Sequence, residues 1–291
     1  MINLRVVAVH AHPDDEAIWT GGLLAHLAAH GADVEVITCT LGEQGEVIGS
    51  RYQNLVAADQ LGGFRISELS ESLTHLGIRG EFLRAPGYWR DSGMVGDAAN
   101  EHPRAFIHSA DKAVKQLIEQ LRDHPPQLLI SYGPDGGYGH PDHIRAHEIT
   151  EAAARYLDIP VLWCVTHQEH LADGLKVISA PAGWRMPKAG ELACVDYSDF
   201  ALRLSDDVLA RKVGAMKAHA TQIWVADGSS CATRPVAAYA PQSDPERAPF
   251  TFCLSNMIAQ PLSRYEHYQF SEFSDPRRLR EIVSLIEGIE R

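Results

Sequence analysis

The chain has 291 residues, of which 45% are hydrophobic and 22% are charged, which is the composition of an ordinary globular protein. This length suits one large domain, or one domain with a smaller appendage. The formal net charge of -12 would repel a phosphate backbone, and the sequence contains no basic run, so we expect no nucleic-acid partner.

The N-terminal segment, residues 4–10, is apolar but too short to span a membrane. It is followed by His-Pro-Asp-Asp and not by a small-residue cleavage site. We therefore expect a cytoplasmic protein with no membrane partner. The five cysteines are scattered and form no C-x-x-C pair, which indicates reduced thiols that pack as small apolar side chains.

The first part of the chain alternates strands and helices. Residues 4–10 are a continuous apolar run of strand length, typical of a strand buried in a parallel sheet. Helical spacing over residues 16–30 ends at Gly31, and a second strand follows over residues 34–39. Further helices are expected over residues 53–61, 65–76, 113–121 and 141–157, and further strands over residues 82–84, 128–132 and 161–166.

This alternation predicts a doubly wound α/β domain with a mostly parallel sheet over residues 1–166. Beyond residue 166 the pattern weakens, and we expect residues 167–291 to form a smaller C-terminal α+β subdomain that completes the active-site cleft. Its expected elements are strands over residues 176–179 and 192–197 and helices over residues 206–219 and 277–289, with a proline-rich stretch over residues 235–249.

Two clusters of histidine and aspartate follow predicted strands. Residues 10–16 come directly after the first strand, and residues 140–143 follow the strand over residues 128–132 and its glycine-rich loop. Ligands bind at the carboxyl ends of the strands in open parallel sheets, so the two clusters can converge on one point. Imidazole and carboxylate groups supply the three ligands that a catalytic zinc ion needs, with a fourth position open to water.

The adjacent residues Asp14 and Asp15 allow a division of labour, in which one carboxylate binds the metal and the other takes a proton from its water. Each cluster also has a purely structural interpretation. Asp14 or Asp15 could cap the helix that follows the first cluster, and His140 or Asp142 could cap the helix that follows the second. The presence of both clusters together favours the metal site.

The two motifs, AHPDDE at residues 11–16 and HPDH at residues 140–143, resemble those of the zinc-dependent N-acetylglucosaminyl-phosphatidylinositol deacetylase superfamily, also called the LmbE-like family. Within it, the chain is most similar to the branch from mycothiol biosynthesis. The resemblance implies an LmbE-like fold and hydrolysis of the acetamide of N-acetylglucosaminyl-inositol, a small N-acetylated glycoside. Residues 39–51, 59–69, 88–94, 136–143 and 212–222 carry this similarity.

Carried over position by position, the resemblance implies that His12, Asp15 and His143 bind one Zn²⁺ per subunit and that Asp14 is the general base. A set of two histidines and one aspartate also accepts ferrous iron.

The resemblance further implies that His140 acts as electrophile or general acid, oriented by Asp142. Tyr138 would help to polarise the amide carbonyl, because hydrolysis concentrates charge on that oxygen.

The resemblance also implies that Arg65, Asp91 and Glu46 bind the sugar and inositol hydroxyls. These residues have structural alternatives, since Arg65 and Glu46 could be surface charges and Asp91 a turn residue. His219 could be a packed or capping histidine, and we leave it outside the metal set.

Trp19 stands at a position where the similar proteins have a small polar residue or lysine. Its indole would reshape the rim of the pocket. Gly139 and the RDSG run at residues 90–93 resemble the deacetylase branch more than the mycothiol S-conjugate amidase branch, which is one alternative. A deacetylase of another N-acyl amino sugar is the other alternative, and it stays open. A noncatalytic nucleotide or sugar binding module is a third hypothesis, but the first strand is not followed by G-x-G-x-x-G. The sequence leaves a homo-oligomer open.

Overall fold

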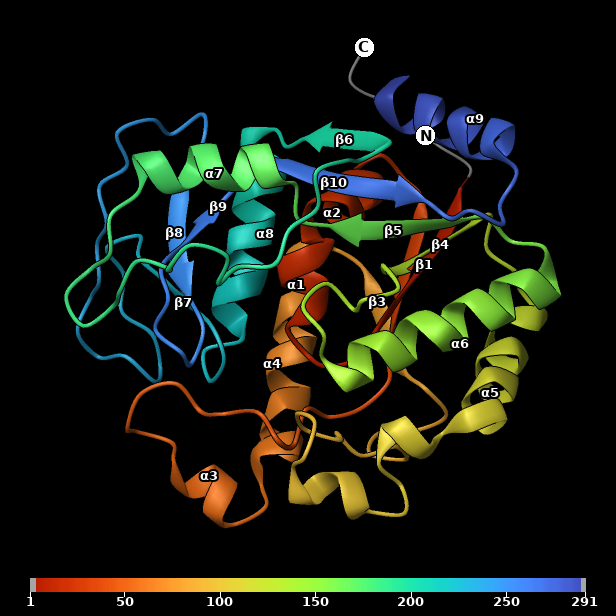
Figure 1. The fold of residues 1–291 in the computed structure, drawn as a ribbon, viewed down its shortest axis with the longest axis horizontal. Helices are drawn as coiled ribbons and strands as arrows, with labels where there is room; N and C mark the ends of the chain where they lie inside the picture. Colours follow the sequence, from red (N-terminus) through yellow and green to blue (C-terminus); the bar gives the residue numbers. More distant parts are fainter. Residues whose placement is uncertain (1–3, 289–291) are drawn as a thin grey trace.

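The computed structural model describes residues 4–288 and has a seven-stranded sheet at its centre (Figure 1). The strands of this sheet are β1 (Arg5–His10), β2 (Asp33–Thr38), β3 (Arg79–Phe82), β4 (Leu128–Tyr132), β5 (Val161–Val165), β6 (Phe200–Arg203) and β10 (Tyr265–Phe270). Their order is β3-β2-β1-β4-β5-β10-β6. The first five run parallel, and β10 is antiparallel to both of its neighbours. The predicted doubly wound, mostly parallel α/β fold is confirmed.

Helices cover both faces of this sheet. They are α1 (Asp15–Trp19), α2 (Gly21–Ala29), α3 (Asn54–Ala57), α4 (Leu61–Leu76), α5 (Ala110–Arg122), α6 (Pro141–Leu157), α7 (Gln168–Val177), α8 (Asp206–Ala218) and α9 (Pro276–Gly288), with 3₁₀ turns at Ala98–Glu101 and Phe106–His108. On one face α2 and α4 pack against α8, and on the other α5 packs against α6 (Figure 1). The strand order reverses between β1 and β4, so right-handed crossovers on its two sides place their helices on opposite faces.

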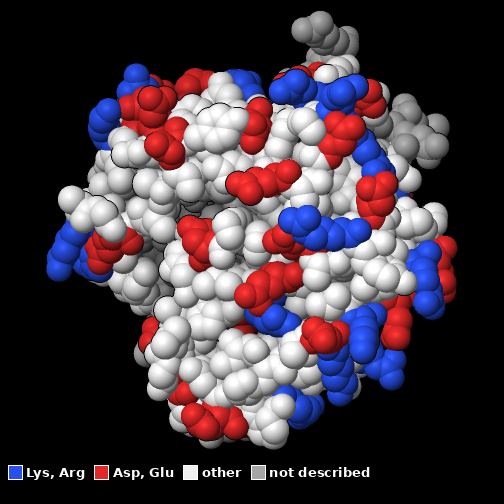
Figure 2. All heavy atoms as spheres, turned by 45° about the vertical axis from the view of Figure 1, so that its right-hand side comes forward, with Lys and Arg blue, Asp and Glu red and all other residues white. Residues whose placement is uncertain are grey.

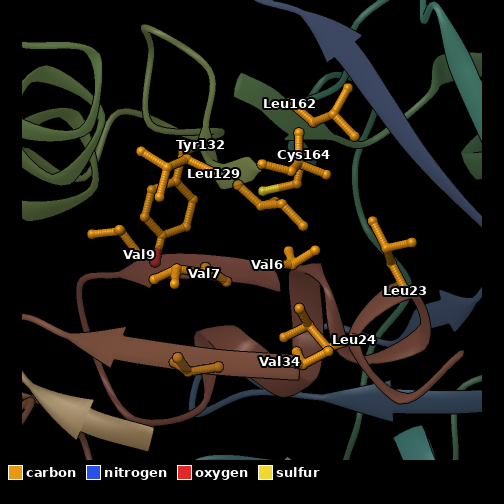
Figure 3. Packing of buried hydrophobic residues seen from close by; sticks show 14 of the residues in the cluster. Val6, Val7, Val9, Leu23, Leu24, Val34, Leu129, Tyr132, Leu162 and Cys164 are labelled. Atoms are coloured by element: carbon orange, nitrogen blue, oxygen red, sulfur yellow. The ribbon is translucent and has the colours of Figure 1, made fainter. Parts of the chain in front are cut away.

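The core is built around β1 and β4. All five residues of β4 are buried, as are five of the six residues of β1, because each strand is covered on both sides. Figure 3 shows Val6 of β1, Leu24 of α2 and Leu129 of β4 in this core. Burial of each such side chain stabilises the fold by roughly 1.5–3 kcal/mol, so the strand ends that follow are firmly placed.

The single helix expected over residues 16–30 is wrong, because it breaks at Thr20 into α1 and α2. The reason lies in residue Glu266, whose carboxylate accepts hydrogen bonds from the backbone N–H groups of Gly22 (2.7 Å) and Leu23 (2.8 Å). A carboxylate in this place satisfies the free N–H groups of a new helix start. A Cβ on Gly22 would lie 2.7 Å from that carboxylate, so the approach requires glycine.

Other expected elements also differ in the structure. Residues 176–179 are not a strand, because α7 continues to Val177, and residues 192–197 lie outside the named strands, with a single bridge from Val195 to His167. The helix expected over residues 53–61 is only the short α3, and the strand expected over residues 82–84 is β3, which ends at Phe82. The terminal helix is present as α9, while Ile289, its expected last residue, lies outside the described residues.

The C-terminal part of the chain contains a small antiparallel sheet of β7 (Trp224–Val225), β8 (Phe250–Cys253) and β9 (Gln260–Leu262). The same part also contributes β6 and β10 to the central sheet. The division at residue 166 therefore stays an interpretation of the sequence. In the described part of the chain, no helix has both the length and the apolar character needed to span a membrane.

Figure 2 shows acidic and basic side chains interspersed over one face of the molecule. No extended basic surface is visible on that face. On this face the acidic side chains are therefore broken up by arginine and lysine.

Candidate active site

The two polar clusters meet at the carboxyl edge of the sheet. Strands β1 and β4 are parallel neighbours, so the loop after His10 and the loop after Tyr132 leave the sheet side by side. This brings the Nδ1 atom of His12 to 3.2 Å from the Nε2 atom of His143. The predicted convergence of the two motifs is therefore present in the fold.

Asp15 completes a compact set of donor atoms with these two histidines. Its carboxylate oxygens lie 3.4 Å from Nδ1 of His12 and 3.4 Å from Nε2 of His143. In a tetrahedral zinc site with ordinary ligand distances, neighbouring donors are about 3.3–3.4 Å apart. The spacing of the three groups fits a divalent cation between them.

Each of the two imidazole rings is oriented by a contact of its other ring nitrogen. The Nδ1 atom of His143 lies 3.0 Å from the carbonyl oxygen of Gly136, which can only accept, so Nε2 is free to bind a metal. The Nε2 atom of His12 faces the carboxylates of Asp142 (3.4 Å) and Asp91 (3.5 Å), which leaves Nδ1 toward Asp15. Three electron-pair donors thus face one point, and this arrangement suits a cation.

The electrostatics of His12 agree with this geometry. Burial opposes protonation of the ring, but the charges and hydrogen bonds of Asp91, Asp142 and Asp15 outweigh it and raise the pKa of His12 well above its ordinary value. For His143 burial dominates and lowers the pKa to about 4. The negative surroundings that favour a proton on His12 would equally stabilise a bound metal ion.

Donors beyond these three residues surround the same point. The nitrogen atoms of His12, His140 and His143 lie within 4.8 Å of one another, and so do donor atoms of His12, Asp91 and Asp142. The described residues therefore offer more than one set of ligands at this edge of the sheet. All five side chains are buried.

Asp14 lies beside this set in an unusual conformation. Its φ of 120° is one that residues other than glycine rarely adopt. It occupies the N-cap position of α1 but makes no side-chain capping bond, so the capping interpretation of Asp14 is wrong. Burial, reinforced by Asp15 and opposed by Arg65, raises the pKa of Asp14 to about 7.

His140 does cap the helix that follows it. Its Nδ1 atom accepts a hydrogen bond from the backbone N–H of Asp142 at 3.1 Å, which starts α6. That bond leaves the ring proton on Nε2. Burial, with the nearby His12 and His143 charges, lowers the pKa of His140 to about 3, so the ring is neutral at pH 7.

Asp142 contacts His140 through its backbone N–H, while its side chain faces His12. Its carboxylate contacts His12 (3.4 Å) and accepts from the backbone N–H of Ser92 (2.9 Å), and only its backbone N–H reaches His140. The start of α6 turns the side chain of its second residue inward, toward the loop after β1. Asp142 is therefore a partner of His12.

The three residues expected at the substrate differ in their burial. Arg65 is buried and not a surface charge, with hydrogen bonds to the carbonyls of Gly42 (2.6 Å) and Pro13 and an ion pair to Asp14 (3.0 Å). Asp91 is buried as well, and it does accept from the backbone N–H of Gly93 (2.8 Å) as a turn residue would. Glu46 is exposed and lines the rim of the cleft.

A cleft of about 640 Å³ opens above these residues. One part of its wall comes from the metal-site loops, including His12, Asp14 and Tyr138, and another from residues of the C-terminal part, including His167 and Gln222. The Tyr138 ring is half exposed and packs edge-on against His143, 5.0 Å between ring centroids. Trp19 lies on the wall, against Gly137.

Sequence reasoning missed a group of buried residues beneath the site. Glu16 is fully buried and bonds to Ser72 of α4 and to His219 after α8. The similarity to the family over residues 212–222, which include His219, was the available signal for this residue. Nothing in the sequence pairs it with Glu16.

The comparison with protein families gives one match over this region. The model described as "PIG-L: GlcNAc-PI de-N-acetylase" matches residues 7–154, which hold both polar clusters. The chain belongs to this family.

Two of the similar curated proteins bear the name 1D-myo-inositol 2-acetamido-2-deoxy-alpha-D-glucopyranoside deacetylase. The protein of Corynebacterium diphtheriae is 60% identical over 273 residues, which cover 92% of this chain and 93% of that protein. The protein of Corynebacterium glutamicum strain R is 63% identical over 269 residues, covering 91% of this chain and 90% of that protein.

Solved structures share the fold at low identity. The zinc-inhibited form of teicoplanin deacetylase Orf2 aligns with a TM-score of 0.54 at 18% identity and covers 93% of this chain and 100% of its own. The N,N'-diacetylchitobiose deacetylase from Pyrococcus horikoshii aligns with a TM-score of 0.51 at 19% identity, covering 75% of this chain and 70% of its own.

Proposed function

We propose that this protein hydrolyses the acetamide of 1D-myo-inositol 2-acetamido-2-deoxy-α-D-glucopyranoside and releases acetate and the free amine. The names of relatives at 60% and 63% identity support this substrate, which belongs to mycothiol biosynthesis. The observation that carries the chemistry is the set of His12, Asp15 and His143, whose donor atoms are 3.2–3.4 Å apart beneath Asp14.

These three residues would hold the divalent metal, which we propose to be Zn²⁺. Two nitrogen donors and one carboxylate are a set that zinc accepts in catalytic sites, and ferrous iron is the alternative. When bound, the ion lowers the pKa of a water molecule and polarises the amide carbonyl. The described residues contribute the remaining parts of the reaction.

Asp14 acts as the general base. Its carboxyl group has a pKa of about 7, near the value at which a base is most useful at neutral pH. It accepts a proton from the attacking water and returns that proton to the amine nitrogen as the C–N bond breaks. Cleavage then gives acetic acid and the neutral amine, which together contain both protons of the water. Transfer of the acid proton to the amine leaves acetate and the ammonium form.

His140 and Tyr138 stabilise the oxygen on which negative charge develops. The neutral His140 ring carries its proton on Nε2, so it acts as an electrophile that donates a hydrogen bond to the oxyanion. Tyr138, two residues earlier in the same loop, adds a phenolic O–H. The Asp142 carboxylate contacts the Nε2 atom of His12, the ring nitrogen that does not face Asp15.

Arg65, Asp91 and Glu46 orient the sugar and the inositol. Glu46 lies exposed at the rim and is free to accept hydrogen bonds from hydroxyl groups. Arg65 and Asp91 line the cleft and also hold the loops around the base and His12. Residues 167–291 close the other side of the cleft as a smaller subdomain.

The test is metal analysis of the purified protein beside an amine-release assay. We expect one zinc per chain and release of amine from N-acetylglucosaminyl-inositol. Asp14→Ala should keep the metal but lose about 10²–10⁴-fold in kcat, because a positioned base contributes that much. Asp59→Ala, at an exposed carboxylate, should behave as the wild type.

Two outcomes would overturn the proposal. Full activity of Asp14→Ala would show that Asp14 is not the general base. Absence of amine release by the wild type would show that the protein does not catalyse this reaction. Turnover of a bimane conjugate of mycothiol is the competing assay. A strong preference for the conjugate would move the substrate to the amidase class.

A further inference from the structure

The backbone of Asp14 has a conformation that its neighbours must hold in place. Its φ is 120° and its ψ is -29°, outside the regions that L-amino acids favour. Such conformations persist only where surrounding groups enforce them, and they gather at active sites. The groups that bind this segment therefore decide where the Asp14 carboxylate points.

Two side chains hold the segment from different directions. Arg65 donates to the carbonyl of Pro13 and pairs with the Asp14 carboxylate at 3.0 Å. Glu16 accepts the backbone N–H of Asp14 on its Oε2 atom at 3.0 Å. Arg65 acts on the carboxylate itself, whereas Glu16 acts on the peptide from which the side chain departs.

Glu16 is in turn fixed by two helices. Its Oε1 atom accepts hydrogen bonds from Ser72 Oγ on α4 (2.5 Å) and from His219 Nε2, directly after α8 (2.6 Å). All three residues are fully buried. The Nδ1 atom of His219 has no hydrogen-bond partner within the described part of the chain, so its polar contact is with Glu16.

Glu16 and His219 shift each other's pKa in opposite directions. Burial pushes the pKa of Glu16 upward, but the charge and hydrogen bond of His219 outweigh it and lower that pKa. For His219 burial acts in the opposite sense, and Glu16 raises its pKa. A buried ion pair with such partners is sensitive to the loss of either member.

We propose that Glu16, held by Ser72 and His219, is a positioning residue that directs the Asp14 carboxylate toward the His12, Asp15 and His143 centre. This inference rests on the proposed function, because it gives Asp14 the role of base. Glu16, Ser72 and His219 do not line the cleft. They act through Asp14 and not through contact with the substrate.

The test compares Glu16→Ala with Glu16→Gln. Glu16→Ala should lower kcat about 10- to 100-fold, because displacement of a reacting group by about 1 Å has this effect. KM should stay within about twofold, and the metal content should not change. Glu16→Gln should recover most of the kcat, since its amide oxygen accepts the same N–H.

Glu68→Ala is the matched control. Glu68, on α4, is a buried carboxylate like Glu16. It accepts hydrogen bonds from the backbone N–H (2.8 Å) and the hydroxyl (2.6 Å) of Thr221 and makes none to Asp14. We expect this variant to lose stability but to keep its kcat. Equal losses of kcat in Glu16→Ala and Glu68→Ala would overturn the proposal.

A crystal structure of Glu16→Ala gives a readout that needs no activity. We expect the Asp14 backbone to leave its positive φ and the carboxylate to turn away. An unchanged Asp14 would overturn the positioning role even if the wild type hydrolysed no acetamide, so failure of this inference and failure of the proposed function are distinguishable. Should Glu16→Ala not fold, Ser72→Ala removes only one hydroxyl and should lower kcat about threefold with Asp14 displaced in its crystal structure.

Discussion

Gly137 and Trp19 are in close contact at the loop that carries Tyr138 and His140. Gly137 has a φ of +80°, and a Cβ there would lie 2.6 Å from the Cη2 atom of the Trp19 indole. The indole also packs edge-on against Tyr132, at 6.0 Å between centroids, and so has little room to withdraw. The Trp19 indole thus limits where this loop can lie.

Gly137→Ala should therefore be destabilising by about 1–3 kcal/mol, through overpacking added to backbone strain. Gly139→Ala is the matched control, because Gly139 has the same positive φ (+85°) but open space around its Cβ position. Gly139→Ala should lose only the stability that backbone strain costs, about 1 kcal/mol. Urea unfolding of both variants measures the difference, and equal losses would contradict a clash with Trp19.

The sequence was informative about residues that follow buried strands. His12, Asp15 and His143 could be expected to converge because β1 and β4 end at the same edge of a parallel sheet. Glu16 and His219 could not be paired, because 203 residues separate them and a lone histidine after a helix has no periodic pattern. Their contact depends on how α8 packs, which local sequence does not specify.

Asp33 links the first three parallel strands at their starting ends. From the start of β2 its carboxylate pairs with Arg5 of β1 at 2.6 Å and with Arg79 of β3 at 2.5 Å. Burial is the largest single influence and raises its pKa, but the hydrogen bond and charge of Arg5, together with the charge of Arg79, outweigh burial and lower the pKa. The folded state therefore favours the ionised carboxylate more than the unfolded state does.

Asp33→Asn should cost about 0.5 kcal/mol at pH 7, a small value because the carboxylate is partly exposed and screened by solvent. This stabilisation is complete above the unfolded pKa of about 3.9 and is lost as the pH falls through the lower folded pKa. Urea midpoints of wild type and variant should therefore converge toward about pH 2. A gap that persists in acid would show that packing and not charge is responsible.

The elements that could be predicted are those whose apolar residues follow a clear pattern. β1 and β4 are apolar runs and α5 is amphipathic, whereas β10 was missed because its sequence is YEHYQF. This strand buries Glu266 and His267, which find partners in Lys212 and in His170 with Ser198. A central strand that buries polar residues with distant partners cannot be predicted from its hydrophobic pattern.

At the scale of the whole molecule, Glu266 joins the two parts of the chain that the sequence suggested were separate. Besides the N–H groups at the start of α2, its carboxylate accepts from Lys212 Nζ at 2.5 Å and from Tyr268 Oη at 2.8 Å. Lys212 also donates to the carbonyl of Ile18 at 2.9 Å, in the helix that begins with Asp15. A buried ion pair thus connects β10 and α8 to the metal-site segment.

Glu266→Ala should cost about 3–5 kcal/mol, because it leaves the Lys212 ammonium buried without its partner. The double variant Glu266→Gln, Lys212→Met should lose less, since neither charge remains, and a double-mutant cycle in urea measures this coupling. Because β10 lies between β5 and β6 in the central sheet, circular dichroism and tryptophan fluorescence should report a single transition in every variant. Two separated transitions would instead mean that residues 167–291 unfold as an independent domain, and the ion pair would then be an interface between domains.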